Sequence, residues 1–315
     1  MKQTLKITPS LFYKIPAITP ITGIHVSKAH IYVSANQITH LVGRSGVDKG
    51  NTYWKLQNLK GLVRGLDTDE HGTTAYLVTD GDKILSFTTQ QQRARGKLAT
   101  FSGVACNYLS LSIDGRLLTA CGDQFLQIFD RDGKEVSKIP VPPPRNAAKL
   151  KFNTFRIGGT LDDSHWFGVT DEDILIGSFG QRTFDAKLPL DPFGSVTHVS
   201  VTKSDVRHIV VAKSEINAQF IRTQLFTYKI EKGIERVSVS STIYSKPTCL
   251  EISSGGRIVA YGQGDFLSLI EVKNNWFEAE RYRVPGISSV AFAGTQRLYM
   301  GTNQGSVYEF DRTDL

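Results

Sequence analysis

The sequence has few of the features that mark a membrane, secreted or disulfide-stabilised protein. It contains only three cysteines, Cys106, Cys121 and Cys249, which are too few and too scattered for a disulfide framework or a zinc cluster. No apolar run approaches the roughly 20 residues that cross a bilayer, and the first residues lack the long apolar core of a signal peptide. No Asn-x-Ser/Thr sequon occurs. We therefore expect an intracellular protein, cytoplasmic or nuclear, without a membrane span.

Linear motifs of catalysis and phosphate binding are also missing. The seven histidines form no HExxH pair, no serine lies in a G-x-S-x-G turn, and GRSGVDKGNT (43–52) is not in P-loop order. DTDEHG (67–72) begins like a calcium-binding loop, but Val78 stands where the bidentate glutamate belongs. We therefore expect no catalytic residues, no bound metal and no cofactor.

What the sequence does contain is a repeated series of short strands. The segments NYLSLS (107–112), RLLTAC (116–121), FLQIFD (125–130) and EVSKIP (135–140) are separated by Asp-Gly and Gly-Asp turns, which predicts a four-stranded antiparallel meander. A glycine close to an apolar residue opens several such units, at Gly23, Gly61, Gly103, Gly194 and Gly286. The last two intervals are about twice as long as the first two, so seven units of about 40 to 45 residues span the chain.

Four strands in each unit of this length are typical of β-propeller blades. We expect an all-β fold with one domain over residues 1–315, a single seven-bladed β-propeller of four-stranded antiparallel blades. The blades are expected at about 21–58, 61–100, 103–140, 147–190, 194–243, 247–284 and 286–311. The seventh unit has only three strands, whereas residues 3–15 belong to no unit. The N-terminal strand should therefore complete the last blade and remove an open sheet edge.

The units DGRLLTACGDQFLQIFD (114–130) and TQRLYMGTNQGSVYEFD (295–311) resemble WD40 repeats. The resemblance covers the whole chain in period and strand order. No Gly-His opens a unit and no Trp-Asp closes a third strand, where Phe129-Asp130 and Phe310-Asp311 are the nearest substitutes. The resemblance implies a degenerate WD40-like propeller repeat protein of no specific subfamily.

On this fold the acidic residues gather in the turns between the second and third strands of the blades. A formal net charge of +7 makes this distribution notable. Two explanations for this distribution stay open. Aspartate is favoured in tight turns because its side chain hydrogen-bonds the backbone, or the carboxylates form an acidic ring that attracts a basic peptide or tail. The proline-rich segment 141–151 either joins this partner-binding face or neutralises it within the fold. The candidate residues are Asp80, Asp82, Asp123, Asp171, Glu172, Asp173 and Asp265, with Arg145 and Lys149.

The opposite face collects bases in the connections between third and fourth strands. With a sequence pI of about 9.2, such a face suits contact with nucleic acid or acidic lipid. Aromatic residues for stacking on bases are not interleaved with these cations, which favours a solvated basic face. The possible basic face consists of Arg93, Arg95, Lys97, Arg182, Lys229 and Lys232.

The function we predict is a non-catalytic protein–protein interaction platform, or scaffold subunit, within a larger assembly. Two alternatives stay open. One is a channel-mouth enzyme, a hydrolase or lactonase using acidic residues and a metal; the other is a nucleic-acid-binding propeller. His25 and His198 fall in innermost strands, where they either line the channel or serve as packed scaffold residues.

Overall fold

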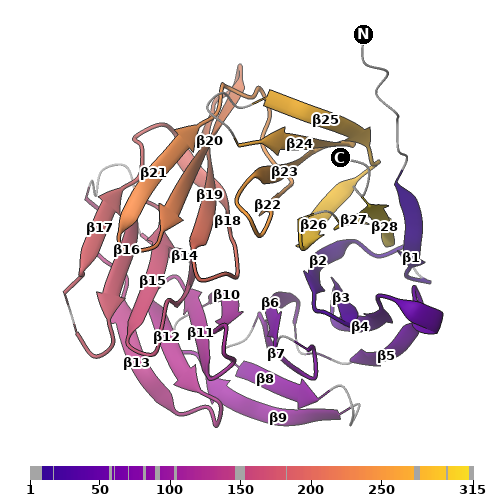
Figure 1. Ribbon diagram of the computed structural model, residues 1–315, viewed down its shortest axis with the longest axis horizontal. Helices are drawn as coiled ribbons and strands as arrows, with labels where there is room; N and C mark the ends of the chain where they lie inside the picture. The colour runs from indigo at the N-terminus through magenta and orange to yellow at the C-terminus, as the bar shows by residue number, and fades with distance from the viewer. Residues whose placement is uncertain are drawn as a thin grey trace.

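The computed structural model consists almost entirely of β-strands, β1 to β28, with one turn of 3-10 helix at Gly46–Asp48. It describes residues 9–16, 18–56, 59, 61–69, 71–80, 83–88, 93–102, 105–145, 153–181, 183–272, 277–295 and 297–311. The strands form seven four-stranded antiparallel sheets arranged as blades around a central axis (Figure 1). The predicted all-β, seven-bladed propeller is confirmed. In this part of the chain no helix is long and apolar enough to cross a membrane.

Six blades use four consecutive strands, and the first strand of each lies innermost. Blade 1 comprises β2 (Ile21–Val26), β3 (His30–Ala35), β4 (Ile38–Gly43) and β5 (Thr52–Leu56); blade 2 comprises β6 (Val63–Thr68), β7 (Thr74–Thr79), β8 (Lys83–Thr88) and β9 (Arg93–Thr100). Blade 3 comprises β10 (Cys106–Leu111), β11 (Leu117–Gly122), β12 (Phe125–Asp130) and β13 (Glu135–Pro140); blade 4 comprises β14 (Phe155–Thr160), β15 (His165–Thr170), β16 (Asp173–Ser178) and β17 (Ala186–Pro189). Blade 5 comprises β18 (Ser195–Val201), β19 (Arg207–Ile216), β20 (Ile221–Ile230) and β21 (Ile234–Val239); blade 6 comprises β22 (Cys249–Ile252), β23 (Ile258–Gln263), β24 (Phe266–Glu271) and β25 (Phe277–Arg283).

Blade 7 combines strands from both ends of the chain. It comprises β26 (Ile287–Ala293), β27 (Arg297–Thr302), β28 (Ser306–Asp311) and, on its outer edge, β1 (Ser10–Lys14). The β1 strand pairs with β28 from Ser10 opposite Glu309 to Lys14 opposite Ser306. The prediction that the N-terminal strand completes the last blade is thus confirmed, and residues 1–8 lie outside the described residues.

The β1 strand also binds the next blade around the ring. Tyr13 is buried, and its hydroxyl lies 2.9 Å from Nδ1 of His40 in β4 and accepts a hydrogen bond of 2.9 Å from Thr52 Oγ1 in β5. Lys49 of blade 1 pairs with Glu309 of β28 at 2.6 Å. The closing strand therefore fastens blade 7 to blade 1.

The hydrophobic core lies between neighbouring blades. Middle strands such as β3, HIYVSA, are buried at nearly every position because blades cover both of their faces, whereas the outer strand β13 alternates between exposed and buried positions over much of its length. Phe167 of blade 4, for example, belongs to the same buried cluster as Ile209 and Phe226 of blade 5. This packing fixes the innermost strands around the channel.

The two faces of the ring carry different connections. The second-to-third strand turns and the links between blades share one face, here called the top face. Hydrogen bonds join the two sets of connections there: Asp80 accepts one from Leu62 N at 2.8 Å, and Asp123 accepts one from Ala105 N at 3.2 Å. The remaining turns form the bottom face.

Candidate functional site

The central channel contains a cavity of about 390 Å³ lined by residues of all seven blades. His25 lies on the wall of this cavity, in agreement with the interpretation that it lines the channel. His198 also belongs to an innermost strand, β18, but it does not line this cavity. Burial lowers the pKa of both imidazoles below the usual value.

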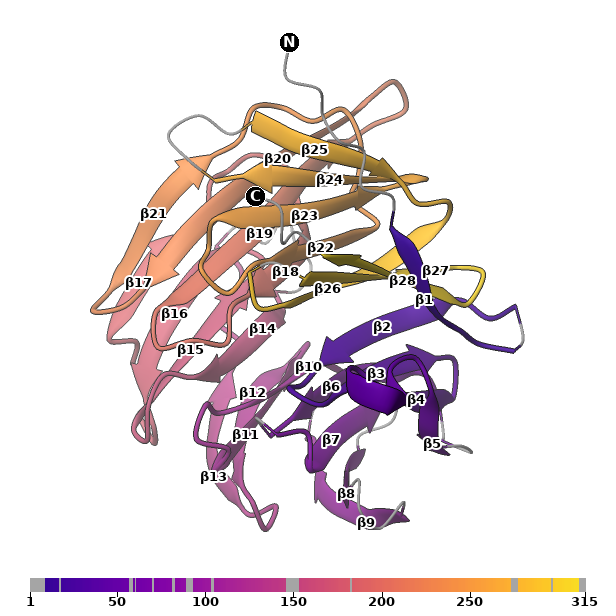
Figure 2. The same ribbon diagram turned by 45° about the vertical axis from the view of Figure 1, so that its right-hand side comes forward.

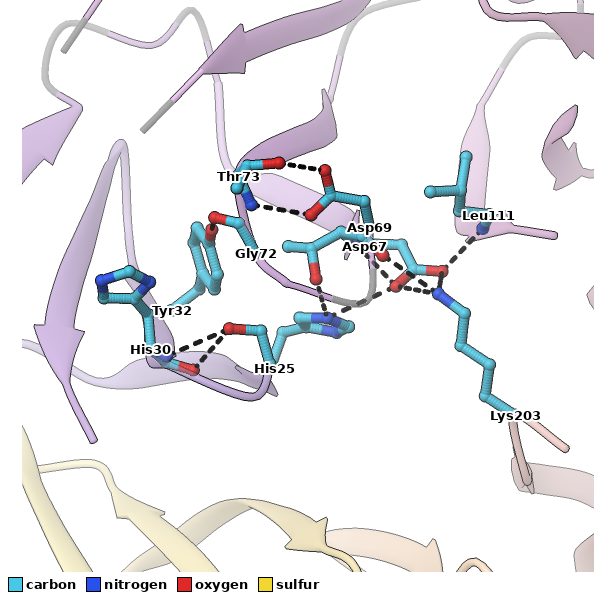
Figure 3. A network of polar contacts seen from close by, with 11 residues as sticks. His25, His30, Tyr32, Asp67, Asp69, Gly72, Thr73, Leu111 and Lys203 are labelled. Carbon is cyan, nitrogen blue, oxygen red and sulfur yellow. Dashed lines mark hydrogen bonds and ion pairs between the residues drawn. The ribbon is translucent and has the colours of Figure 1, made fainter. Parts of the chain in front are cut away.

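An ion pair crosses the channel from blade 5 to blade 2 (Figure 3). Lys203 Nζ lies 3.0 Å from both carboxylate oxygens of Asp67 and also donates to the carbonyl of Thr68 at 3.1 Å. The amide of Leu111, from blade 3, donates to Asp67 Oδ2 at 2.6 Å, and His25 Nε2 lies 3.3 Å from Asp67 Oδ1. Three blades besides its own therefore contact one carboxylate.

The surroundings of Asp67 keep it ionised although it is only 5% exposed. Burial alone would raise its pKa, but Lys203, His25 and the Leu111 amide together lower the pKa below the usual value. Each oxygen of this carboxylate already accepts from several donors. Its most direct role is to hold blades 1, 2, 3 and 5 in position around the channel.

The structure gives no support to a calcium loop at 67–72. Asp67 lies within β6, whereas Asp69 accepts hydrogen bonds from Thr73 N at 2.7 Å and Thr74 N at 3.0 Å in the following turn. The two carboxylates have separate partners. Among the described residues, no group of three or more His, Cys, Asp or Glu side chains is placed to hold a metal ion.

A second group of polar side chains lines the channel wall farther round the ring. Ser200 donates to Glu251 Oε2 at 3.0 Å, and burial raises the pKa of Glu251 to about 8, so this carboxyl is mostly protonated at neutral pH. Arg207 is buried and donates to the carbonyls of Thr202 at 3.2 Å and Thr160 at 3.1 Å. Sequence patterns did not signal this group, because its members come from different blades.

The carboxylates of the predicted acidic face bind the backbone of their own face. Besides Asp80 and Asp123, Asp265 accepts a hydrogen bond from Gly286 N at 2.8 Å, and Asp80 also pairs with Arg64. Asp82 lies outside the described residues. The geometry agrees with the turn-forming alternative that the sequence left open, while Asp80 and Asp265 remain partly accessible.

The acidic turn of blade 4 is neutralised within the fold. Asp173, 1% exposed, pairs with Arg145 and, at 3.2 Å, with Lys187. Glu172 accepts a hydrogen bond from Arg145 N at 2.6 Å, and Asp171 pairs with Arg156 at 2.6 Å. The structure therefore brings Arg145 together with Glu172 and Asp173, in an ion-pair cluster whose carboxylates are largely covered and whose cations are half-exposed, and Lys149 lies outside the described residues.

The predicted basic face is placed only in part. Lys229 pairs with Glu231 at 2.6 Å on the bottom face, and Lys232 is exposed in the turn that follows β20. The backbone of Arg93, Arg95 and Lys97 belongs to β9, but their side chains lie outside the described part of the structure, as does Arg182. A contiguous basic patch thus stays a prediction.

Sequence reasoning missed a hollow surface on the top face between blades 5 and 6. A groove of about 660 Å³ runs along the link 240–246 and the strands β23 and β24. Beside it the β19–β20 hairpin, with ten residues in each strand, extends beyond the neighbouring turns (Figure 2). Exposed apolar side chains mark this region, which we call the blade 5–6 surface: Ile216, Ile221, Tyr244 and Phe266.

Comparison with known proteins identifies the fold. No protein-family model matches the sequence, and no curated protein matches it. Among the solved structures that match is the β-propeller domain of Cps50 (Swd1) from Myceliophteria thermophila, with a TM-score of 0.75 and 14% identity over 93% of this chain and 97% of that domain. At this identity the likeness concerns the fold alone. The chain has the fold of a WD40-like seven-bladed β-propeller.

Proposed function

We propose that this propeller is a non-catalytic platform that binds other proteins as a subunit of a larger assembly. The observation that carries the proposal is the blade 5–6 surface. Four of the twelve large hydrophobic side chains that are exposed among the described residues belong to it, and two of them, Tyr244 and Phe266, line a groove of about 660 Å³. Single exposed hydrophobic residues are ordinary, whereas a gathered set on a rigid frame is typical of a protein-binding surface.

Fold analogy supports the same class of function. WD40-like propellers are typically protein-interaction scaffolds, and connections on a rigid scaffold carry most binding sites. The acidic turns remain a second proposed contact, for a basic peptide, in which the accessible carboxylates of Asp80 and Asp265 would take part. The three buried free thiols suit a reducing, intracellular location, cytoplasmic or nuclear.

The alternatives have weaker support. Asp67 is engaged by Lys203, Leu111 and Thr68, so it is poorly placed to act as a base or to bind a metal in a hydrolase or lactonase. On the bottom face Lys229 is paired with Glu231. Retention of RNA or DNA that falls steeply with salt would instead favour the nucleic-acid-binding alternative.

The test is partner purification from the native source with variant proteins. The triple variant Ile216→Ser/Ile221→Ser/Tyr244→Ser removes apolar contact area from the blade 5–6 surface, and we expect it to lose most of the bound partner. Ile113→Ser/Val136→Ser, on blade 3, is the matched control and should keep the partner. If both variants capture the same proteins in the same amounts as the wild type, this surface is not the platform.

A further inference from the structure

We propose that the groove of the blade 5–6 surface binds an extended acidic segment of a partner protein, with one apolar side chain of that segment packed on Tyr244 and Phe266. The inference rests on the proposed function, because it names the chemistry of the partner for the same surface. It differs from the basic partner considered for the acidic turns. Three features of the groove lead to it: its rigidity, its charge and its aromatic side chains.

The wall of the groove is held rigidly by both blades. Thr223 of β20 and Ile243 exchange backbone hydrogen bonds of 2.7 and 2.8 Å. The carbonyl of Ser245 accepts hydrogen bonds from Thr223 Oγ1 at 2.6 Å and from Tyr261 Oη of blade 6 at 2.7 Å. Between these two fixed residues, Tyr244 is 78% exposed. An aromatic side chain on a preformed backbone is typical of a binding hot spot, since little order is lost when a partner docks.

The charge of the groove is positive. Its lining residues include Lys246 and Arg281, and none of them is an aspartate or glutamate. The Arg281 guanidinium lies over the Phe266 ring, 4.4 Å from its centroid, so cation and apolar contact are offered side by side. At the rim, the carboxylate of Asp265 is hydrogen-bonded to Gly286 N. Inside the groove an acidic side chain therefore meets two cations, and the like charge of Asp265 lies at the rim.

The remaining lining side chains suit a peptide backbone. Ser241 and Thr242 bring hydroxyl groups to the link that lines the groove, where they can bond the amides and carbonyls of an extended chain. The neighbouring hairpin adds exposed Ile216 and Ile221. These aliphatic side chains add apolar area that suits a protein partner. A single-stranded nucleic acid would instead stack on Tyr244 and Phe266 beside the two cations, and the experiment below includes it as a competitor.

The experiment selects binding peptides from a phage library of random dodecapeptides. On the wild-type protein we expect enrichment of Asp and Glu around one aromatic or branched apolar residue. Lys246→Glu/Arg281→Glu should lose the acidic enrichment, and Tyr244→Ser should lose the apolar one. Lys229→Glu/Lys232→Glu, on the bottom face, is the charge-matched control and should select the same peptides as the wild type.

The best selected peptide then gives a quantitative readout by fluorescence anisotropy. Its Kd should rise about tenfold or more in the Lys246→Glu/Arg281→Glu variant, and wild-type binding should weaken as salt rises. Melting temperatures check folding, and Lys246→Met/Arg281→Gln replaces the charge-reversed variant if that variant melts early. The loss of affinity should persist in this neutral variant.

Three results would overturn the proposal: selection of basic or uncharged peptides, equal binding of acidic peptides by the charge-reversed variant, or displacement of the peptide by a single-stranded oligonucleotide. The two proposals fail separately. If native partners depend on Tyr244 but no acidic peptides are selected, the platform stands and the acidic segment does not. If acidic peptides bind the groove but native partners are unaffected by the triple variant, the platform proposal fails alone.

Discussion

At the scale of single residues, acidic side chains in this propeller are used chiefly to bond the protein itself. Asp123 and Asp265 accept hydrogen bonds from backbone amides of the top face, and Asp173 is enclosed by Arg145 and Lys187. A count of acids by position therefore overstates the negative charge that a partner can reach. Glu251 is a different case, because its environment favours the uncharged form.

Glu251 should make the stability of the protein depend on pH. Its pKa is raised from 4.5 to about 8 by burial, so the folded state binds its proton more tightly than the unfolded state does. The stability that protonation provides is complete below about 4.5 and is lost as the pH rises through about 8. The Glu251→Gln variant cannot ionise and should therefore become more stable than the wild type as the pH is raised.

Urea unfolding at several pH values measures this effect. The gain in free energy of unfolding on Glu251→Gln is expected to grow by up to about 1.4 kcal/mol for each pH unit between about 4.5 and about 8. Glu280→Gln, on the outer strand of the same blade, is the control. A difference between variant and wild type that is constant across pH would show that the buried carboxyl is not protonated.

At the scale of elements, the short strand β1 joins the two ends of the chain in one blade. Five residues close the outer edge of blade 7, and Tyr13 reaches His40 and Thr52 of blade 1. Deleting residues 1–15 removes these contacts and exposes the free edge of β28. We expect the truncated chain to melt at a lower temperature and to associate, because an unpaired edge is a template for another strand.

Size-exclusion chromatography and thermal unfolding check this prediction. Leu11→Ser provides the control, since Leu11 is 59% exposed and its replacement keeps the β1 backbone in place. The closure argument would be refuted by a truncated protein that stays monomeric with the melting temperature of the full chain.

At the scale of the whole molecule, the ion pair of Asp67 and Lys203 links blades 2 and 5 across the channel. Replacing Lys203 by Met leaves a buried carboxylate without its main counter-charge. Breaking a surface ion pair costs about 1 kcal/mol of unfolding free energy, and breaking a fully buried pair costs about 3–5 kcal/mol. Because Lys203 is 39% exposed, we expect a loss between these two values. Lys203→Arg should restore most of it in urea unfolding. Equal stability of Lys203→Met and wild type would mean that this ion pair does not stabilise the fold.

The period of the sequence was enough to predict the blades, because each is a local meander with turn residues at regular intervals. The first strand of blade 3, for instance, was expected at 107–112 and lies at Cys106–Leu111. The channel contacts were not predictable in this way. Asp67 and Lys203 are 136 residues apart, and no local pattern links a lysine after β18 to an aspartate in β6. The blade 5–6 groove was missed for a similar reason, since it depends on how a link packs between two blades.

The seam at blade 7 has a consequence for the order of folding. In each of the other six blades, every strand pairs with a strand that is close to it in the sequence. In blade 7, β1 and β28 pair although their residues are 299 positions apart. Closing a loop of that size costs about 5 kcal/mol of chain entropy, and nothing in the seam offsets this cost until the six intervening blades have brought the two strands together. Topology of this kind places local contacts early and distant ones late. The strand that precedes all others in the chain is therefore the last to be paired.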